Sequence, residues 1–566
     1  MIYKPVFIFI ICILQTACKV EQKVDLILWN AAVFTADTTH PMAEAIAIVG
    51  SKIFAVGSND SIRKFEGKGT KLIDLEGNFV MPGLIEGHGH FIGLGKNLVQ
   101  LNLLNTKSYQ EVADLLKEKV ASTPKGEWIE GRGWHQDKWL NKAAISFQSY
   151  PYHDLISSVS PDNPVLLYHA SGHALLANEK AMQLAGISKE TQSPEGGRMV
   201  KDQTGKLIGI FEENAMDLIQ TSYSENQSKK SVEEKSEYLK MISQLASDHI
   251  LKYGISSFQD AGTTLYDIRE LHTLCMNRTI QPRLYVMLNE AKSQETLAHL
   301  DSMPFASQNP LYFQSSAVKA YLDGALGSYG AWLLNPYDDY PGHSGQTIMG
   351  VEELEKIAEK AYSKNVQFCI HAIGDKANRE VLNLYEKYSL QDSKRKDLRW
   401  RIEHAQHIDP ADISRFALLG VIASIQAIHC TSDMPFLTKR LGETRAKSTS
   451  YPWRSLLNHQ VHMANGTDCP VESINPFECI YASITRKRLD SGMAFTPEQK
   501  MTRDEALKSY TIWNAFAAKE ETIKGSITAG KLADIIVLDR NLLECKEEDI
   551  PKTKVVHMFL DGKQLY

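Results

Sequence analysis

Residues 80–90 read Val80-Met81-Pro82-Gly83-Leu84-Ile85-Glu86-Gly87-His88-Gly89-His90. An apolar run that ends among glycines and histidines is typical of a buried strand whose carboxyl end enters a polar site. Side chains two apart on a strand point to the same face, so His88 and His90 can reach one metal ion. The glycines let the backbone bend closely around that ion. Histidines at this spacing also occur by chance, so the rest of the chain must decide.

Seven more strand-like apolar runs follow, separated by stretches of helical character. The eight runs are Met81 to His90, Ile255 to Gly262, Arg283 to Leu288, Ala317 to Gly324, Val366 to Gly374, Trp400 to Gln406, Val421 to Ile428 and Val461 to Asp468. Eight successive βα units predict the α/β class and a (β/α)₈ TIM barrel over residues 81–522. Active sites of such barrels form at the carboxyl ends of the strands.

Two further regions do not fit the βα repeat. The interval from about 100 to 245 is too long for a simple crossover, and we interpret it as an inserted subdomain that caps the barrel mouth after the first strand. Residues 18–80 and 523–566 both read as short β segments with turns. Because each piece alone could bury little apolar surface, we expect them to pair into one small discontinuous β-sandwich.

The first 18 residues predict export. Lys4 precedes the apolar run 6–14, which is too short to span a bilayer and reads as a signal peptide over residues 1–17. The segment 14–18, Leu-Gln-Thr-Ala-Cys, resembles a bacterial lipoprotein cleavage box that would leave Cys18 as the lipidated first residue. We therefore expect a lipoprotein of the bacterial periplasm or cell envelope, anchored to a membrane through Cys18.

Composition narrows the partners. Sixty-two basic and 68 acidic residues give a formal charge of −6. The sequence has no long block of like charges, so we do not expect nucleic acid as a partner. Six cysteines beyond the first 18 residues show no CxxC spacing and read as buried structural residues, although a disulfide stays open in an exported protein. A homodimer is compatible with the sequence.

Metal-ligating and ionisable residues recur at the predicted strand ends. They are Lys319, His371 in Cys-Ile-His-Ala, His404 in Ile-Glu-His-Ala, and Asp468 in Asn-Gly-Thr-Asp. A single histidine in such a place is most often structural. Several sites that converge on one mouth from independent strands are better explained by a shared centre, because catalytic groups on this architecture come from several strand ends.

These segments resemble the amidohydrolase superfamily, specifically the amidohydrolase-3 branch that includes N-substituted formamide deformylases. The resemblance covers nearly the whole mature chain and is carried by residues 81–90, 319–328 (Lys-Ala-Tyr-Leu-Asp-Gly-Ala-Leu-Gly-Ser), 525–527 and 530–534 (Gly-Lys-Leu-Ala-Asp). The family usually has Asp where Glu86 stands and Ser-Asp where Thr467-Asp468 stands; both changes keep the ligands.

The resemblance implies a ligand set for one or two divalent metal ions. His88 and His90 would bind the first ion, His371 and His404 the second, and Asp468 would be the remaining ligand and the proton acceptor. Lys319 would occupy the bridging position. An ammonium group has no lone pair for a cation, so bridging requires a carbamate on Lys319 formed with CO₂. The alternative is an unmodified lysine in an ion pair beside a single metal ion. Imidazole and carboxylate ligands favour zinc, with iron or manganese as alternatives.

The implied activity is that of a metal-dependent hydrolase that cleaves a non-peptide C–N bond. A metal-bound hydroxide would attack an amide-like carbonyl of an N-acyl or formamide-type substrate, and Asp468 would pass the proton to the departing nitrogen. A deaminase or a cyclic-amide hydrolase on the same site is the nearest alternative. A non-catalytic solute-binding lipoprotein is the alternative from another class, which the intact ligand set disfavours.

Three further residues are predicted to bind substrate. His173 lies in a segment, Tyr168 to Ala174, that resembles the pocket-histidine segment of the family. Trp134 could form an aromatic lid, although a tryptophan in this setting more often packs in a core. Asp323, beside the lysine strand, is expected to line the pocket or to brace Lys319.

Overall fold

The computed structural model describes residues 24–104, 106–136, 139–140, 146–169, 174–194, 197–389 and 397–566. The predicted signal peptide, Cys18 and His173 therefore lie outside the described residues. Within the described ranges, no helix combines the length and apolar character needed to cross a membrane.

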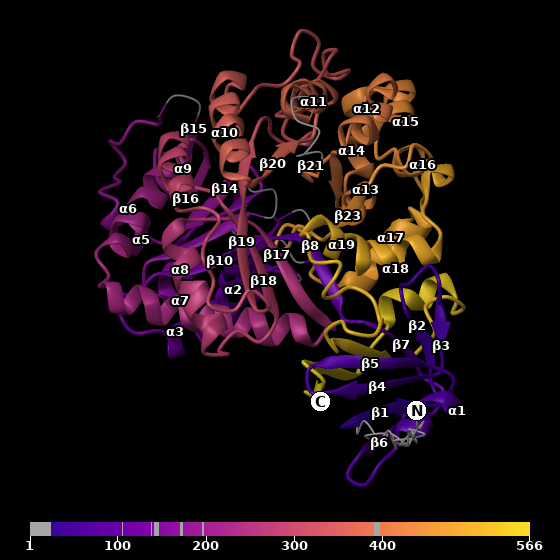
Figure 1. Ribbon diagram of the computed structural model, residues 1–566. Helices are drawn as coiled ribbons and strands as arrows, with labels where there is room; N and C mark the ends of the chain where they lie inside the picture. Colours follow the sequence, from indigo (N-terminus) through magenta and orange to yellow (C-terminus); the bar gives the residue numbers. More distant parts are fainter. Residues whose placement is uncertain are drawn as a thin grey trace, which may run out of the picture.

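A barrel of eight parallel strands forms the centre of the molecule and confirms the predicted α/β fold (Figure 1). The strands, in spatial order, are β8 (Leu84–Gly89), β17 (Ile255–Thr263), β18 (Arg283–Leu288), β19 (Phe313–Tyr321), β20 (Gln367–Ala372), β21 (Arg401–His404), β22 (Ile422–Ile425) and β23 (Met463–Asn465). All eight coincide with predicted runs. Across the seam between β23 and β8, the backbone N–H of Asp468 donates to the carbonyl of His88 at 2.8 Å. This bond ties the last ligand loop to the first.

The predicted first strand is divided between two sheets. Its start belongs to β7 (Phe79–Pro82), which pairs antiparallel with β24 (Ile535–Leu538) outside the barrel. The chain then passes through Gly83, where a Cβ atom would stand 2.4 Å from the hydroxyl of Ser256. Only glycine fits this close approach. The sequence shows no break here because both strands are apolar.

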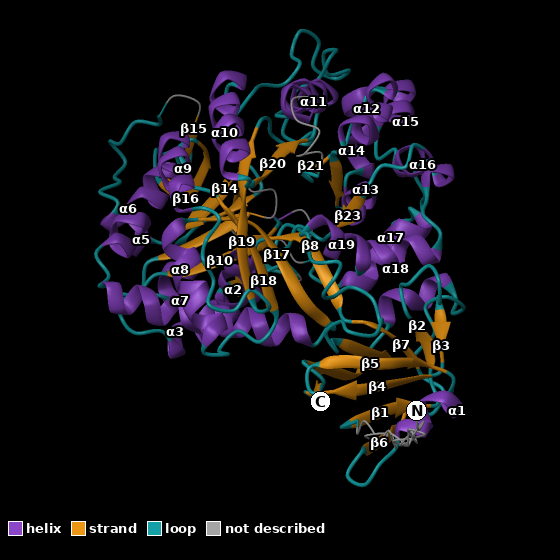
Figure 2. Cartoon of the chain, in the orientation of Figure 1, coloured by secondary structure: helices purple, strands orange, loops and turns teal. Residues whose placement is uncertain are grey.

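Helices surround the barrel strands and extend from their ends (Figure 2). Helix α7 begins with a capping box in which Ser231 and Glu234 bond each other's backbone, and its buried residues recur at the spacing of one helical face. The helices of this part are α2 (Phe91–Val99), α7 (Val232–Leu251), α8 (Leu265–Met276), α9 (Ser293–His299), α10 (Val351–Lys364), α11 (Asp375–Ser389), α12 (Ile413–Leu419), α13 (Ala427–Ser432), α14 (Met434–Leu441), α15 (Glu443–Thr449), α16 (Trp453–Asn458), α17 (Pro476–Thr485), α18 (Arg503–Ser509) and α19 (Ile512–Ala517).

The insertion after the first barrel strand forms its own layer. Its six-stranded sheet has the order β15 (Gly197–Lys201), β16 (Leu207–Glu213), β14 (Ala174–Ala177), β13 (Val165–His169), β10 (Ile129–Trp134) and β9 (Leu101–Asn102). It also contains the hairpin β11 (Ser146–Phe147) and β12 (Tyr150–Pro151), with helices α3 (Tyr109–Ser122), α4 (Asp154–Val159), α5 (Glu179–Leu184) and α6 (Met216–Ser228). Helix α7 packs on α2 and on β17, so the predicted boundary near residue 245 falls inside a barrel helix.

Strands from both ends of the chain lie together beside the barrel, where Figure 1 shows indigo and yellow segments side by side. One sheet has the order β5 (Lys52–Gly57), β4 (Ala45–Val49), β1 (Leu26–Trp29) and β6 (Lys71–Asp74). The other has the order β26 (Lys563–Gln564), β25 (Val555–Leu560), β24, β7, β2 (Ala32–Phe34) and β3 (Met42–Ala43). The short helix α1 (Asn59–Ile62) follows β5. A shared apolar core, with Leu28 and Ile46 from one sheet and Val537 from the other, holds the layers together.

Candidate metal centre

The predicted ligands meet at the carboxyl ends of the barrel strands. One ligand atom each from His88, His404 and Asp468 lies within 4.8 Å of the others, and all three side chains are buried. Nε2 of His90 stands 3.1 Å from Oδ1 of Asp468. The ring of His371 lies 4.3 Å, between centroids, from that of His404. Five residues from four different strand ends thus form one cluster.

Lys319, the sixth predicted ligand, is buried on the same barrel. Its Nζ atom lies 3.5 Å from the carbonyl of Ala261 and 4.5 Å from the ring centre of Tyr321. Among the described residues, no carboxylate lies within ion-pair distance of this ammonium group. The geometry therefore supplies no partner for the ion pair that the unmodified-lysine alternative required.

The cluster leaves ligand atoms unused. Nε2 of His88, Nε2 of His371 and Nδ1 of His404 are buried without a hydrogen-bond partner in the described part of the chain. Buried polar atoms nearly always have partners, so three such nitrogens around one carboxylate need an explanation. A divalent cation among His88, His404 and Asp468, whose ligand atoms lie within 4.8 Å of one another, would explain the unpartnered nitrogens of these two rings. Imidazole with carboxylate is a donor set that such ions accept.

The charge states also suit a cation. Burial, reinforced by the charge of Lys319, lowers the pKa of His371 to about 3. Burial and the neighbouring His371 hold the pKa of His404 well below its usual value. Burial alone would raise the pKa of Asp468, but His88 and His90 hold it well below its usual range. Neutral imidazoles and an ionised carboxylate are the forms that bind metal.

A buried glutamate that we did not single out from the sequence orients one ligand. Oε2 of Glu403 lies 2.5 Å from Nδ1 of His88, which directs Nε2 of that ring toward the cluster. Burial opposes the ionisation of Glu403, yet the charge and hydrogen bond of His88 lower its pKa to about 2. His404 has a φ of 76°, a region that L-residues rarely adopt. The strand therefore breaks at its end, and the adjacent Glu403 and His404 both serve the site.

Comparison with known proteins identifies the family of this chain. The family model described as "Amidohydrolase family" matches residues 71–566. The chain belongs to the amidohydrolase family. It is 32% identical to the protein LONG AFTER FAR-RED 3 of Arabidopsis thaliana, over 96% of this chain and 91% of that one. It is 26% identical to an N-substituted formamide deformylase of Arthrobacter pascens, over 96% and 99%. An uncharacterised metal-dependent hydrolase from Pyrococcus horikoshii superposes with a TM-score of 0.75 at 27% identity, covering 92% of this chain and 99% of that one.

A histidine that we did not predict also lies beside the ligand cluster of this amidohydrolase. His429, on α13 just after β22, places Nε2 3.9 Å from Oδ2 of Asp468. Its ring stacks on that of His404, with centroids 6.0 Å apart. One oxygen of Asp468 thus faces His88 and His90, whereas the other faces His429.

The described residues among the predicted substrate-binding set occupy different surroundings. Asp323 is fully buried, and its carboxylate accepts backbone N–H bonds from Trp332, Ile373 and Gly374 at 2.8–2.9 Å. Burial raises its pKa to about 7. It fastens the loop after β19 to the end of β20, and Oδ1 lies 3.7 Å from Nε2 of His371. It is His371, not Lys319, that this carboxylate approaches.

Trp134 is fully buried in the core of the insertion. Its indole N–H donates to the carbonyl of Leu167 at 2.8 Å, and its ring lies edge-on to that of His169, with centroids 4.8 Å apart. A substrate-binding role for Trp134, Asp323 or His173 stays a prediction.

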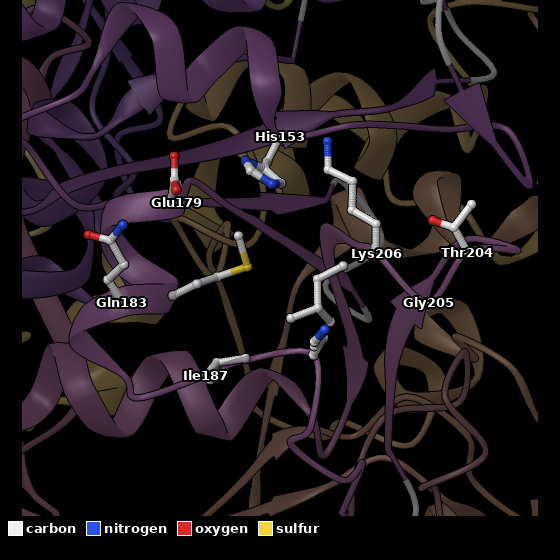
Figure 3. Close-up of a pocket in the computed structure, with 10 residues that line it drawn as sticks. His153, Glu179, Gln183, Ile187, Thr204, Gly205 and Lys206 are labelled. Carbon is white, nitrogen blue, oxygen red and sulfur yellow. The ribbon is translucent and has the colours of Figure 1, made fainter.

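The insertion of this amidohydrolase carries a cavity of about 390 Å³ between α5 and β16 (Figure 3). His153 and Lys206 line it, but Nδ1 of His153 bonds the hydroxyl of Ser157 and Lys206 pairs with Asp154 at 2.8 Å. None of the six predicted ligands lines this cavity. The chemistry gathers at the barrel mouth instead.

Proposed function

We propose that this hydrolase cleaves a non-peptide C–N bond in an amide-like substrate of N-acyl or formamide type. The observation that carries the proposal is the buried group of His88, His404 and Asp468, whose ligand atoms lie within 4.8 Å of one another and in which an imidazole nitrogen of each histidine has no hydrogen-bond partner among the described residues. The similarity to a formamide deformylase along nearly the whole length of both chains supports the choice of a C–N bond.

A divalent cation, zinc by its ligand preference, would supply an acidified water and an electrophile for the carbonyl oxygen. His88 and His90 would hold a first ion and His371 and His404 a second where two are bound, with Asp468 completing the set; Nε2 of His88, Nε2 of His371 and Nδ1 of His404 have no hydrogen-bond partner among the described residues. Lys319 would contribute as a carbamate formed with CO₂; its burial and the lack of an ion-pair partner among the described residues support this role.

Asp468 is the residue that we assign to proton transfer. Its carboxylate would accept a proton from the attacking water and donate it to the departing nitrogen, so that an amide and water yield a carboxylic acid and an amine. Its Oδ2 atom lies 3.9 Å from Nε2 of His429, and we propose that the leaving group departs on this side.

The decisive experiment compares the metal-loaded wild type with Asp468→Asn in a screen of N-acylated amines that follows amine release. We expect kcat to fall by about 10²- to 10⁴-fold in Asp468→Asn, the usual range for loss of a general acid–base group. Asp217→Asn, on the exposed surface of α6, is the matched control and should behave as wild type. Unchanged turnover in Asp468→Asn would reject this mechanism.

We further propose that the protein is exported and anchored through a lipid on Cys18. The support is the basic-apolar start and the cleavage-box pattern of residues 14–18. Incorporation of labelled palmitate by wild type but not by Cys18→Ser is the expected result, and equal labelling of both would contradict it.

A further inference from the structure

Tyr321 stands directly above the predicted bridging residue. Residues two apart on a strand share a face, so Tyr321 follows Lys319 on the interior of β19 at its mouth end. The ring centre lies 4.5 Å from Nζ of Lys319 and 5.4 Å from the ring centre of His371. The side chain is only half-buried, so one side of the ring reaches open space.

That open space is a cavity of about 390 Å³ on the same face of the barrel. Asn289 and Glu290, which follow the end of β18, line it together with Tyr321, Ile348 and Met349. The carboxamide of Asn289 donates to the backbone carbonyl of Lys319 at 3.1 Å. The cavity therefore adjoins the strand of the bridging residue, and Tyr321 forms the wall between the two.

The loop after β19 closes the cavity from the other side. The backbone N–H of Ile348 donates to the carbonyl of Leu322 at 2.8 Å, which returns the loop to the strand end beside Tyr321. Tyr321, Ile348 and Met349 thus present an aromatic ring and two aliphatic side chains to one space. The rest of the lining is mostly polar, so this apolar side is where an apolar group of matching size would pack.

Charge excludes one class of occupant. Two carboxylates border the cavity: Glu290, which is 9% exposed and accepts from Nδ1 of His299 at 2.7 Å, and Glu353, which accepts from the hydroxyl of Ser293. Lys292 also lines the cavity, but its side chain is 72% exposed. Its ammonium group lies 3.7 Å from the carboxylate of Glu295, a residue that is not part of the lining. A carboxylate on the occupant would meet two like charges and one well-solvated lysine.

We propose that this cavity binds one substituent of the amide substrate, an uncharged aromatic or bulky apolar group, and that Tyr321 is the specificity-determining residue on which it packs. The proposal rests on the proposed function for its catalytic readout. The scissile bond would lie at the ligand cluster, and the substituent would extend past the ring of Tyr321.

The test compares three acetamides: N-phenethylacetamide, the same amide with a para-carboxylate, and N-methylacetamide, which has no arm. In Tyr321→Ala, the ratio of kcat/KM for N-phenethylacetamide to kcat/KM for N-methylacetamide should fall about tenfold. Tyr321→Phe should retain the preference of the wild type. Tyr266→Ala, at a 45% exposed tyrosine on α8 outside the cavity, is the matched control.

Ile348→Lys provides a test that does not depend on truncation. The residue is 64% exposed, so the protein should tolerate the change. A lysine here should raise kcat/KM for the para-carboxylate amide about two- to fivefold relative to N-phenethylacetamide, the range of an exposed ion pair. Equal losses of Tyr321→Ala on the armed and the armless amide, or no shift in Ile348→Lys, would overturn the subsite.

Failure of the proposed function is separable from failure of the subsite. If the metal-loaded wild type hydrolyses none of the three amides, binding of N-phenethylacetamide is measured by calorimetry on the same proteins. Binding to wild type and Tyr266→Ala that is lost in Tyr321→Ala supports the cavity even then. Equal binding of N-phenethylacetamide to wild type, Tyr266→Ala and Tyr321→Ala, or no binding to wild type, rejects the subsite.

Discussion

The two ends of the barrel both bury charged side chains but treat them in opposite ways. At the mouth, imidazole nitrogens of His88, His371 and His404 have no hydrogen-bond partner among the described residues. At the amino end of β18, Arg283 forms two bonds to Asp534, at 2.7 and 2.8 Å, and a third to Asp561 at 2.5 Å. At the mouth, polar atoms remain without protein partners among the described residues, whereas at the amino end of β18 the charged groups bond to one another.

This difference separates segments that bind a ligand from segments that hold the fold together. The Gly-Lys-Leu-Ala-Asp segment at 530–534 contains no ligand, yet its Asp534 joins the sheet of β24 to the barrel through Arg283. Charged pairs at that end act on stability, because burial makes each partner dependent on the other. The neutral imidazoles at the mouth act on binding instead, because they have nitrogen atoms without a hydrogen-bond partner among the described residues.

The largest effect should come from breaking the paired end. Arg283→Leu leaves the buried Asp534 without its ion-pair partner, whereas Asp561 keeps Arg278 at 3.4 Å. We expect the free energy of unfolding to fall by about 3–5 kcal/mol. Denaturant unfolding measures this change. Arg63→Leu, which removes an exposed pair with Glu66, should cost less than about 1 kcal/mol. If Arg283→Leu were as stable as Arg63→Leu, the buried network would have no role in holding the two parts together.

A smaller effect should follow at the mouth. Glu403→Gln keeps the shape but weakens the bond that orients His88, and we expect metal affinity to fall by about 10- to 100-fold, or about 1.4–2.7 kcal/mol. Competition with a chelator measures the affinity. Glu352→Gln, exposed on α10, is the control. Retained affinity in Glu403→Gln would mean that the cluster orients His88 without help.

Sequence patterns predicted the barrel well because each strand carries its own signal. Apolar runs of strand length between helical stretches recovered all eight strands, and the family resemblance supplied the ligand set. Contacts that depend on distant segments were missed. Glu403 reaches His88 across 315 positions of sequence, and its orientation depends on the backbone at His404, where φ is 76°. No local sequence pattern predicts this backbone angle.

The start of the first barrel strand was misplaced for a related reason. The break at Gly83 separates two apolar strands that read as one run, and the close approach of Ser256 that requires it comes from β17, far along the chain. His429 was missed because it lies on the short helix α13 after the strand end, where periodicity gives no direction for a side chain. Its role depends on Asp468, which arrives from a separate loop.

The smallest expected effect is a pH dependence confined to the paired end. Burial opposes ionisation of Asp534, but the charge and hydrogen bonds of Arg283 lower its pKa below the ordinary value of 3.8. A carboxylate with a lowered pKa contributes stability that is fully present above its unfolded pKa and is lost as the pH falls through its folded pKa. The stability advantage of wild type over Asp534→Asn should therefore stay constant from about pH 8 to pH 5 and shrink below about pH 4, by about 1.4 kcal/mol for each unit of pKa displacement. Denaturant unfolding at several pH values measures it, with Asp60→Asn, on the exposed helix α1, as the control. A constant advantage down to pH 2 would show that the charge of Asp534 adds nothing beyond its hydrogen bonds, and the contrast between the two ends of the barrel would then rest on hydrogen-bond pairing alone.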